Sequence, residues 1–198
     1  MGGKYHHGDL RAELVRVGLE LIAERGLDGF SVAEVARRAK VSAAAPYRHF
    51  AERESLLAAV AADLARRLAD EVAEAAEAHD DVAESLAAAA GAYTASLIGR
   101  RAGMELINAE ALQGEQHAEL HDQVRRLTDQ FLLRCLQIAP APEALELMEQ
   151  LFTQAHGYGT FWLNGVFTKH GYTPDLVVRK STRAARIAVA GHQVDDRP

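Results

Sequence analysis

Apolar residues recur every three or four positions along most of this chain, and no stretch alternates apolar and polar side chains as a half-buried strand does. The pattern predicts an all-α protein. A helix that reaches Arg25 and ends at Gly26 is followed by two short helices, then by a long one from about Glu52 to Glu77. Later periodic segments predict helices over residues 82–100, 103–112, 119–138, 143–167 and 175–190.

The segment around which this order is arranged is SVAEVARRAKVSAAAPYRHF, residues 31–50. Ser31 stands where an N-cap belongs, and Glu34 is placed to close a capping box with it. Residues 40–42 form a three-residue turn, after which a second short helix is predicted to begin at Ala43. Two helices joined in this way are typical of a helix-turn-helix.

The second short helix has a surface suited to DNA. Residues 43–45 are all Ala and can approach a groove floor closely, while residues 47–49 supply hydrogen-bond donors. A helix-turn-helix places the start of its second helix against base edges and flanking donors against phosphates. From Arg37 to Arg53, five Lys or Arg residues accompany one acid, which predicts a basic surface. The predicted DNA contacts are Ser31, Lys40, Ser42, Ala43, Ala44, Tyr47, Arg48, His49 and Arg53.

Residues 5–57 resemble the DNA-binding domain of TetR-family transcriptional regulators of the TetR/AcrR type. The matching pieces are YHHGDLR, AERGLDGFSVAEVARRA, VSAAAPYRHF and FAERESLL. The resemblance implies that the Tyr, His and Arg positions meet phosphates and that the small residues lie against bases. Lys40 stands where Gly is usual, which costs roughly 1 kcal/mol if the residue is left-handed. Arg53 stands where Lys is usual, which keeps the charge.

The net charge of −6, taken alone, argues against nucleic acid as a partner, but the charge is unevenly divided. Residues 1–56 hold nine Lys or Arg and eight Asp or Glu, whereas the remainder holds thirteen and twenty. An acidic body with a locally basic tip would approach a polyanion tip first. We therefore expect a three-helix helix-turn-helix DNA-binding domain over residues 1–56. The resemblance implies that the long helix joins it to a larger helical ligand-binding and dimerisation domain over residues 57–198.

Features that report on the compartment point to the cytoplasm. Cys135 is the only cysteine, so no intrachain disulfide can form, as suits a reducing cytosol. The N-terminus lacks an apolar signal-peptide core, and no apolar run approaches the length of a membrane span. We expect a soluble, unexported protein with no membrane partner.

The helix predicted over residues 143–167 is apolar on two sides and so needs to be covered on two sides. One cover is its own bundle, and a second copy of the chain best explains the other. The predicted dimer interface is Leu147, Leu151, Tyr158, Phe161, Trp162 and Ile187. The stretch FTQAHGYGTFWLNG also resembles the WHG-type C-terminal domain of one branch of these regulators. His156 and Gly157 match its signature, and Phe152 stands where the Trp is expected.

A ligand pocket is harder to place, because plain core packing explains each candidate residue equally well. The candidates are Tyr93, Met104, Asn108, Phe131, Cys135, Met148, Phe152 and His156. No charged cluster points inward by spacing, which favours a mainly apolar, neutral or weakly polar molecule.

Two pairs of histidines have spacings that metal ligands use. His117 and His121 stand four apart, but no third ligand is evident nearby. His6 and His7 are adjacent in an arm, where histidines more often meet DNA backbone or solvent. We predict no metal and no cofactor.

These features favour a homodimeric, ligand-responsive repressor that binds a palindromic double-stranded DNA operator and is released by an unknown small molecule. One alternative is an all-α enzyme using His156, His117 with His121, or Cys135. The chain shows no paired carboxylate with a partnering base, no phosphate loop and no nucleophile motif, so we predict that it is not an enzyme. The other alternative is a helical adaptor whose helix-turn-helix binds protein instead of DNA.

Overall fold

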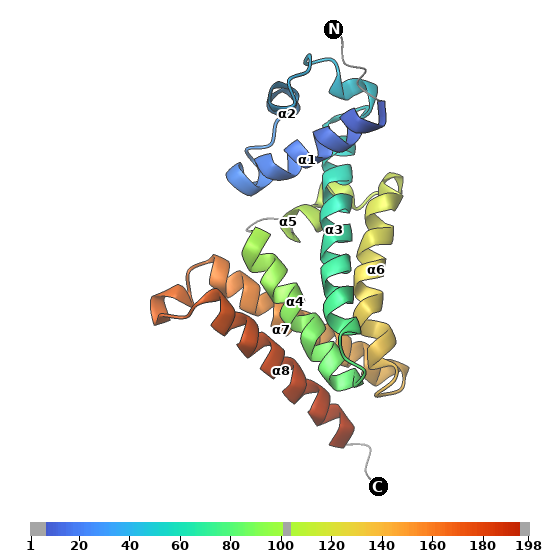
Figure 1. Ribbon diagram of the computed structural model, residues 1–198. Helices are drawn as coiled ribbons and strands as arrows, with labels where there is room; N and C mark the ends of the chain where they lie inside the picture. Colours follow the sequence, from blue (N-terminus) through green and yellow to red (C-terminus); the bar gives the residue numbers. More distant parts are fainter. Residues whose placement is uncertain (1–6, 101–103, 195–198) are drawn as a thin grey trace. The chain divides into compact units, whose positions relative to one another are not determined.

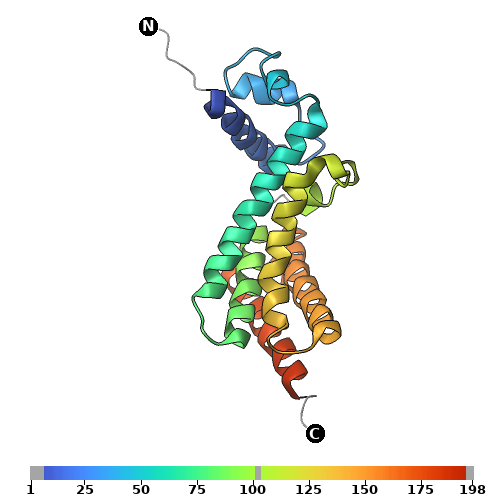
Figure 2. The same cartoon turned by 90° about the vertical axis from the view of Figure 1, so that its right-hand side faces the viewer.

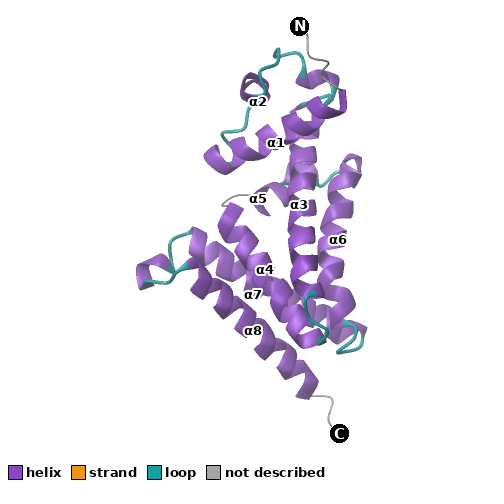
Figure 3. Cartoon of the chain, viewed as in Figure 1, coloured by secondary structure: helices purple, strands orange, loops and turns teal. Residues whose placement is uncertain are grey.

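The computed structural model describes residues 7–100 and 104–194, and every regular element within these ranges is a helix (Figure 1, Figure 3). The all-α prediction is confirmed. The elements are α1 (His7–Arg25), α2 (Val32–Arg38), η1 (Pro46–Arg48), α3 (Arg53–Glu77), α4 (Val82–Arg100), α5 (Met104–Ile107), η2 (Glu110–Leu112), η3 (Glu115–His117), α6 (Ala118–Cys135), α7 (Ala141–Leu163), η4 (Thr168–His170) and α8 (Pro174–Val194).

Most helices begin and end within a few residues of the predicted bounds. The long helix α3 starts one residue after its predicted start, and α4 has the predicted bounds. Asp81 fixes the start of α4, because its Oδ1 accepts a hydrogen bond from the backbone N–H of Glu84 at 2.9 Å. The segment predicted as one piece over residues 103–112 instead contains two separate single turns, α5 and η2.

The chain forms two compact units. The first unit takes in the chain up to Ala65 together with the segment that ends at Val124, and the second unit takes in the rest. The two units are defined by contacts within the chain. The predicted division between residues 56 and 57 instead separates DNA binding from ligand binding and dimerisation. The functional division remains a prediction.

The core of the first unit is built from two separate parts of the sequence. The helices α1, α2 and the start of α3 contribute fully buried residues such as Leu14, Val35 and Leu56. A segment from the middle of the chain adds the buried side chains of Leu106, Ile107, Leu112 and Leu120 to the same cluster. An ion pair of 3.2 Å between Arg11 and Glu119 joins the two parts at the surface. The helix-turn-helix therefore rests on a core that it does not build alone.

In the second unit, α4 packs against both α7 and α8 (Figure 1, Figure 2). Two glycines allow this close packing. A Cβ at Gly91 would lie 2.3 Å from Thr182 Oγ1, and one at Gly159 would lie 2.9 Å from Leu97 Cδ2. The buried hydroxyl of Thr94 joins all three helices, since it donates to the Ala155 carbonyl at 3.1 Å and lies 2.7 Å from the Ser181 hydroxyl.

Two residues of the predicted dimer interface are corrected by their burial. Leu147 and Leu151 are fully buried within the second unit of one protomer, so their side chains cannot face a partner. The buried residues of α7 are Ala144, Leu147, Leu151, Ala155 and Gly159, which its own unit covers. Phe161 and Ile187 remain 52% and 62% exposed, while Tyr158 and Trp162 are half-buried.

No helix in the described ranges is both long enough and apolar enough to cross a membrane.

Candidate nucleic-acid interface

The turn of the helix-turn-helix begins with a helix cap that holds Lys40 in an unusual conformation. The N–H of Lys40 bonds to the carbonyl of Arg37 at 3.2 Å, and the N–H of Val41 bonds to that of Ala36 at 3.0 Å. This pair of bonds is the Schellman motif, which requires a left-handed residue. Lys40 has a φ of 57° and is the only non-glycine residue with positive φ in the described ranges. The left-handed conformation considered for Lys40 is confirmed.

The second element of the motif differs from the prediction. A regular helix beginning at Ala43 is not formed; residues 43 and 44 form a turn, and a single 3-10 turn follows over Pro46–Arg48 (Figure 3). The backbone bonds span three residues, from Ala45 to Ser42 at 2.9 Å and from Arg48 to Ala45 at 3.2 Å. Pro46 lacks the N–H that an α-helical bond to Ser42 would need, which explains the tighter turns.

Buried residues anchor this stretch while its polar residues point outward. Pro46 and Phe50 are buried, whereas Tyr47 is 55% exposed and His49 is half-buried. The other predicted DNA contacts are all exposed, namely Ser31, Lys40, Ser42, Ala43, Ala44, Arg48 and Arg53. All but Ser31 belong to one continuous run that the turns present to solvent.

The surroundings of Ser31 and Arg53 bear on their predicted roles. Ser31 is the N-cap of α2 with extended backbone, as predicted, but its side chain makes no capping hydrogen bond. The predicted capping box is therefore wrong. The guanidinium of Arg53 lies 5.6 Å from the centre of the Phe30 ring and 3.7 Å from the Glu54 carboxylate. Arg53 is thus held near the surface without being buried.

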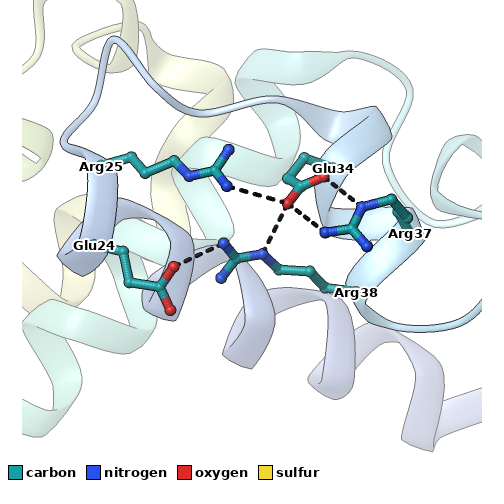
Figure 4. A network of polar contacts seen from close by, with 5 residues as sticks. All are labelled: Glu24, Arg25, Glu34, Arg37 and Arg38. Carbon is teal, nitrogen blue, oxygen red and sulfur yellow. Dashed lines mark hydrogen bonds and ion pairs between the residues drawn. The ribbon is translucent and has the colours of Figure 1, made fainter.

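Instead of capping α2, Glu34 binds arginines (Figure 4). Its carboxylate accepts two hydrogen bonds from Arg37, at 2.7 and 2.8 Å, and one from Arg38 at 3.1 Å. Arg38 also donates to Glu24 at 2.7 Å. The predicted basic excess counted Arg37 and Arg38 as available charges, which is wrong because both are paired. The i, i+3 and i, i+4 spacings of Glu34 with these arginines were the signal that could have revealed it.

In the second unit, four of the candidate pocket residues come together. The Tyr93 hydroxyl lies 3.3 Å from His156 Nδ1, and the Tyr93 ring packs edge-on against Phe152 with centres 5.4 Å apart. Phe152 in turn lies against Phe131, with centres 4.4 Å apart. We call these four residues the aromatic cluster. Burial raises the pKa of the Tyr93 hydroxyl, so the phenol stays neutral and can act as a donor.

The other pocket candidates are placed differently. Cys135 is fully buried and Met148 is half-buried in the second unit, whereas Asn108 is exposed and belongs to the first unit. Met104 begins α5, and its side chain lies outside the described residues.

Among the described residues, His117 and His121 gain no third ligand. His117 is buried, and its Nε2 has no hydrogen-bond partner in the described part of the chain, while His121 Nε2 lies 3.4 Å from the Leu112 carbonyl. No group of three or more potential metal ligands occurs among the described residues. His6 and the side chain of His7 lie outside them.

Comparison with known proteins bears on the first unit directly. Residues 14–60 match the family model described as bacterial regulatory proteins, tetR family. This range contains α2, the Lys40 turn and the exposed run that follows it. No curated protein matches the chain.

Solved structures extend the likeness to nearly the whole chain. A protein of unknown function from Rhodococcus sp. RHA1 is 26% identical with a TM-score of 0.79, over 93% of this chain and 97% of that one. A possible TetR family transcriptional regulator from Streptomyces coelicolor A3(2) is 19% identical with a TM-score of 0.65, over 93% and 99%.

A third similar structure is the transcriptional regulator FadR from Bacillus subtilis in complex with stearoyl-CoA, 16% identical with a TM-score of 0.67, over 91% and 98%. Likeness at the lower identities shows a shared fold, and the family match locates the DNA-binding domain within it. Residues 14–60 thus belong to the tetR family of bacterial regulatory proteins, within a fold that the chain shares with solved transcriptional regulators.

Proposed function

We propose that this regulator is a homodimeric, ligand-responsive repressor that acts in the cytoplasm and binds a palindromic operator through the run from Lys40 to Arg53. The observation that carries the proposal is the arrangement of this run. Within this run the side chains of Pro46 and Phe50 are buried, while those of Tyr47 and Arg48 are exposed to solvent. An anchored backbone with outward donors is what a DNA-reading element requires.

We assign the contacts by side-chain chemistry. Tyr47, Arg48, His49 and Arg53 would donate hydrogen bonds to phosphates, as would Ser31 and Lys40 at the start of the motif. Ser42, Ala43 and Ala44 are exposed and small, so they would lie against base edges. Phosphate contacts hold the protein on the duplex, and contacts to bases select the sequence.

A second copy of the chain would cover the remaining apolar surface of α7 and α8. Phe161 and Ile187 are more than half exposed, and Tyr158 and Trp162, near Phe161 in sequence, are half-buried. Two-fold symmetry would then place two helix-turn-helix motifs in successive major grooves, about 34 to 36 Å apart on a palindromic site.

The aromatic cluster is our proposed effector site. It offers aromatic surface from Phe131 and Phe152 and a single polar pair, Tyr93 with His156. Such a site suits a mainly apolar, neutral or weakly polar molecule. The stearoyl-CoA bound to the related FadR supports an apolar effector. A thermal-shift screen tests this, since a ligand that binds the folded state raises the unfolding temperature.

An enzymatic role receives no support from the one nucleophile that the sequence offered. Cys135 is fully buried, and burial raises the pKa of its thiol to about 11. A thiolate is the reactive form, and little of it exists at neutral pH with such a pKa.

The proposal is tested by titrating the protein with its own upstream DNA and with unrelated duplex at several salt concentrations. We expect a steep salt dependence and a clear preference for the upstream DNA. Tyr47→Ala should weaken binding to both by about tenfold or more, because a hydrogen bond to a charged group contributes about 1.5 to 3 kcal/mol. Equal weak binding to both duplexes, unaffected by this change, would support the adaptor alternative.

Lys40→Gly is expected to stabilise the protein while weakening its binding to DNA. The left-handed backbone costs a lysine roughly 1 kcal/mol that glycine does not incur. Loss of one phosphate contact should lower the slope of log affinity against log salt by about 0.9. Thermal unfolding and salt titrations measure the two effects. Lys40→Ala is the control, since it removes the charge without relieving the strain. Undiminished DNA affinity in both variants would remove Lys40 from the interface.

A further inference from the structure

Glu34 is the centre of a charge cluster in the first unit that contains more arginines than acids (Figure 4). Besides its bonds to Arg37 and Arg38, its Oε1 lies 3.6 Å from Arg25 Nη2. Glu24 is the only other acid of the cluster, and it binds Arg38. Three guanidinium groups are thus held by two carboxylates, one of which contacts all three.

The cluster lies at the edge of the motif that meets DNA. Arg37 belongs to the last turn of α2, and its carbonyl accepts the hydrogen bond that forms the Lys40 cap. The Arg37 side chain is 71% exposed, whereas those of Glu34 and Arg38 are only 17% and 20% exposed. An exposed guanidinium beside this turn would be available to a phosphate if no carboxylate held it.

Hydrogen bonds from arginine favour the ionised carboxylate of Glu34 at neutral pH. The hydrogen bonds from Arg37, followed by those from Arg38, lower the pKa of its carboxyl to about 2. Arg37 and Glu34 also form a two-bond, side-on pair, the geometry by which arginine binds carboxylate most specifically. A phosphate would have to compete with a partner that is charged at neutral pH and already in place.

We propose that Glu34 limits the affinity of the protein for DNA of any sequence, because it withholds Arg37 and its neighbouring arginines from DNA phosphates. This inference rests on DNA binding by the same motif, as proposed above. Contacts to phosphates carry no sequence information, so they raise affinity for operator and unrelated DNA alike. By holding these arginines, Glu34 limits binding to both and leaves the choice of sequence to residues that meet bases.

The test uses the full-length protein and the variants Glu34→Gln and Glu34→Gln with Arg37→Gln. Each phosphate contact adds about 0.9 to the salt slope, which is about a threefold to fourfold change in affinity between about 50 and 200 mM salt. Glu34→Gln should steepen the slope on unrelated duplex by about one to two contacts and tighten that binding severalfold. Operator affinity should rise by a similar factor, and adding Arg37→Gln should reverse most of the change on both duplexes.

Glu13→Gln is the matched control. Glu13 forms a pair of the same geometry with Arg16 on α1, at 2.6 and 2.8 Å, and its replacement raises the net charge by the same amount. Arg16 keeps Glu20 as a partner, so the control frees no guanidinium. An equal steepening in Glu13→Gln would mean that net charge alone acts, and it would overturn the inference.

Arg37→Gln alone gives a test that does not depend on how Glu34→Gln folds. If Arg37 is withheld from phosphates, this variant binds unrelated DNA with the wild-type salt slope. A slope lower by about one contact would overturn the inference, as would an unchanged slope in folded Glu34→Gln. The proposed function fails separately, if the wild-type protein shows no operator preference and Tyr47→Ala binds as well as wild type.

Discussion

Leu112→Ala is expected to destabilise the first unit by about 2 to 5 kcal/mol, the usual cost of truncating a buried leucine in a core that relaxes only in part. Leu112 is fully buried in the cluster that also contains Leu14 and Leu56. Phe50, which anchors the exposed run, belongs to that cluster as well. The substitution should therefore reduce operator binding at temperatures where the wild-type protein is fully folded, although Leu112 is far from the motif in sequence.

Urea unfolding measures the loss of stability. We expect a lower midpoint concentration and an unchanged dependence of the free energy of unfolding on urea concentration. Leu133→Ala is the control, because Leu133 is 60% exposed and its truncation should change stability by no more than about 0.5 kcal/mol. Equal stabilities of the Leu112 and Leu133 variants would show that the middle segment does not belong to this core.

Gly159→Ala is expected to destabilise the second unit by about 1 to 3 kcal/mol through overpacking. The added methyl would lie 2.9 Å from Leu97 Cδ2 and 3.0 Å from Leu97 Cβ, and the second of these atoms cannot move without the backbone of α4. The cost arises because α4 and α7 approach each other at a residue that has no side chain.

Gly157→Ala on the same helix provides the opposite result. A Cβ there would meet nothing within 4 Å, so alanine should stabilise α7 by roughly 0.5 to 1 kcal/mol through its higher helix propensity. Thermal unfolding of the two variants beside wild type measures both effects. A loss of stability in Gly157→Ala, or none in Gly159→Ala, would contradict the packing described for these helices.

The helices could be predicted from the sequence because their signals are local. The apolar period of α4 and the N-cap at Asp81 lie within the segment that they define, and α4 has the predicted bounds. Local signals also explain one error. The three alanines favour a helix from Ala43, but Pro46 removes a backbone donor and the chain forms 3-10 turns instead.

The other errors concern contacts that the sequence pattern alone does not determine. Two apolar stripes on α7 could each face the protomer's own bundle, and the sequence does not say that the buried face combines Leu147 and Leu151 of one stripe with Ala155 and Gly159 of the other. The count of basic residues near the motif began at Arg37 and so left out Glu34, three positions earlier. The charged residues near a site indicate what it can bind only when the ion-pair partner of each charged group is known.

Because its interior includes Leu106, Leu112 and Leu120, the first unit is not a removable module. A fragment ending at Ala65 would leave an uncovered apolar face and should aggregate or remain partly unfolded. Chimaeras that exchange DNA-binding heads between members of the family would need to carry the segment ending at Val124 as well. Across relatives, substitutions in this middle segment should co-vary with substitutions in α1 and the start of α3, because the two parts of the chain share one core.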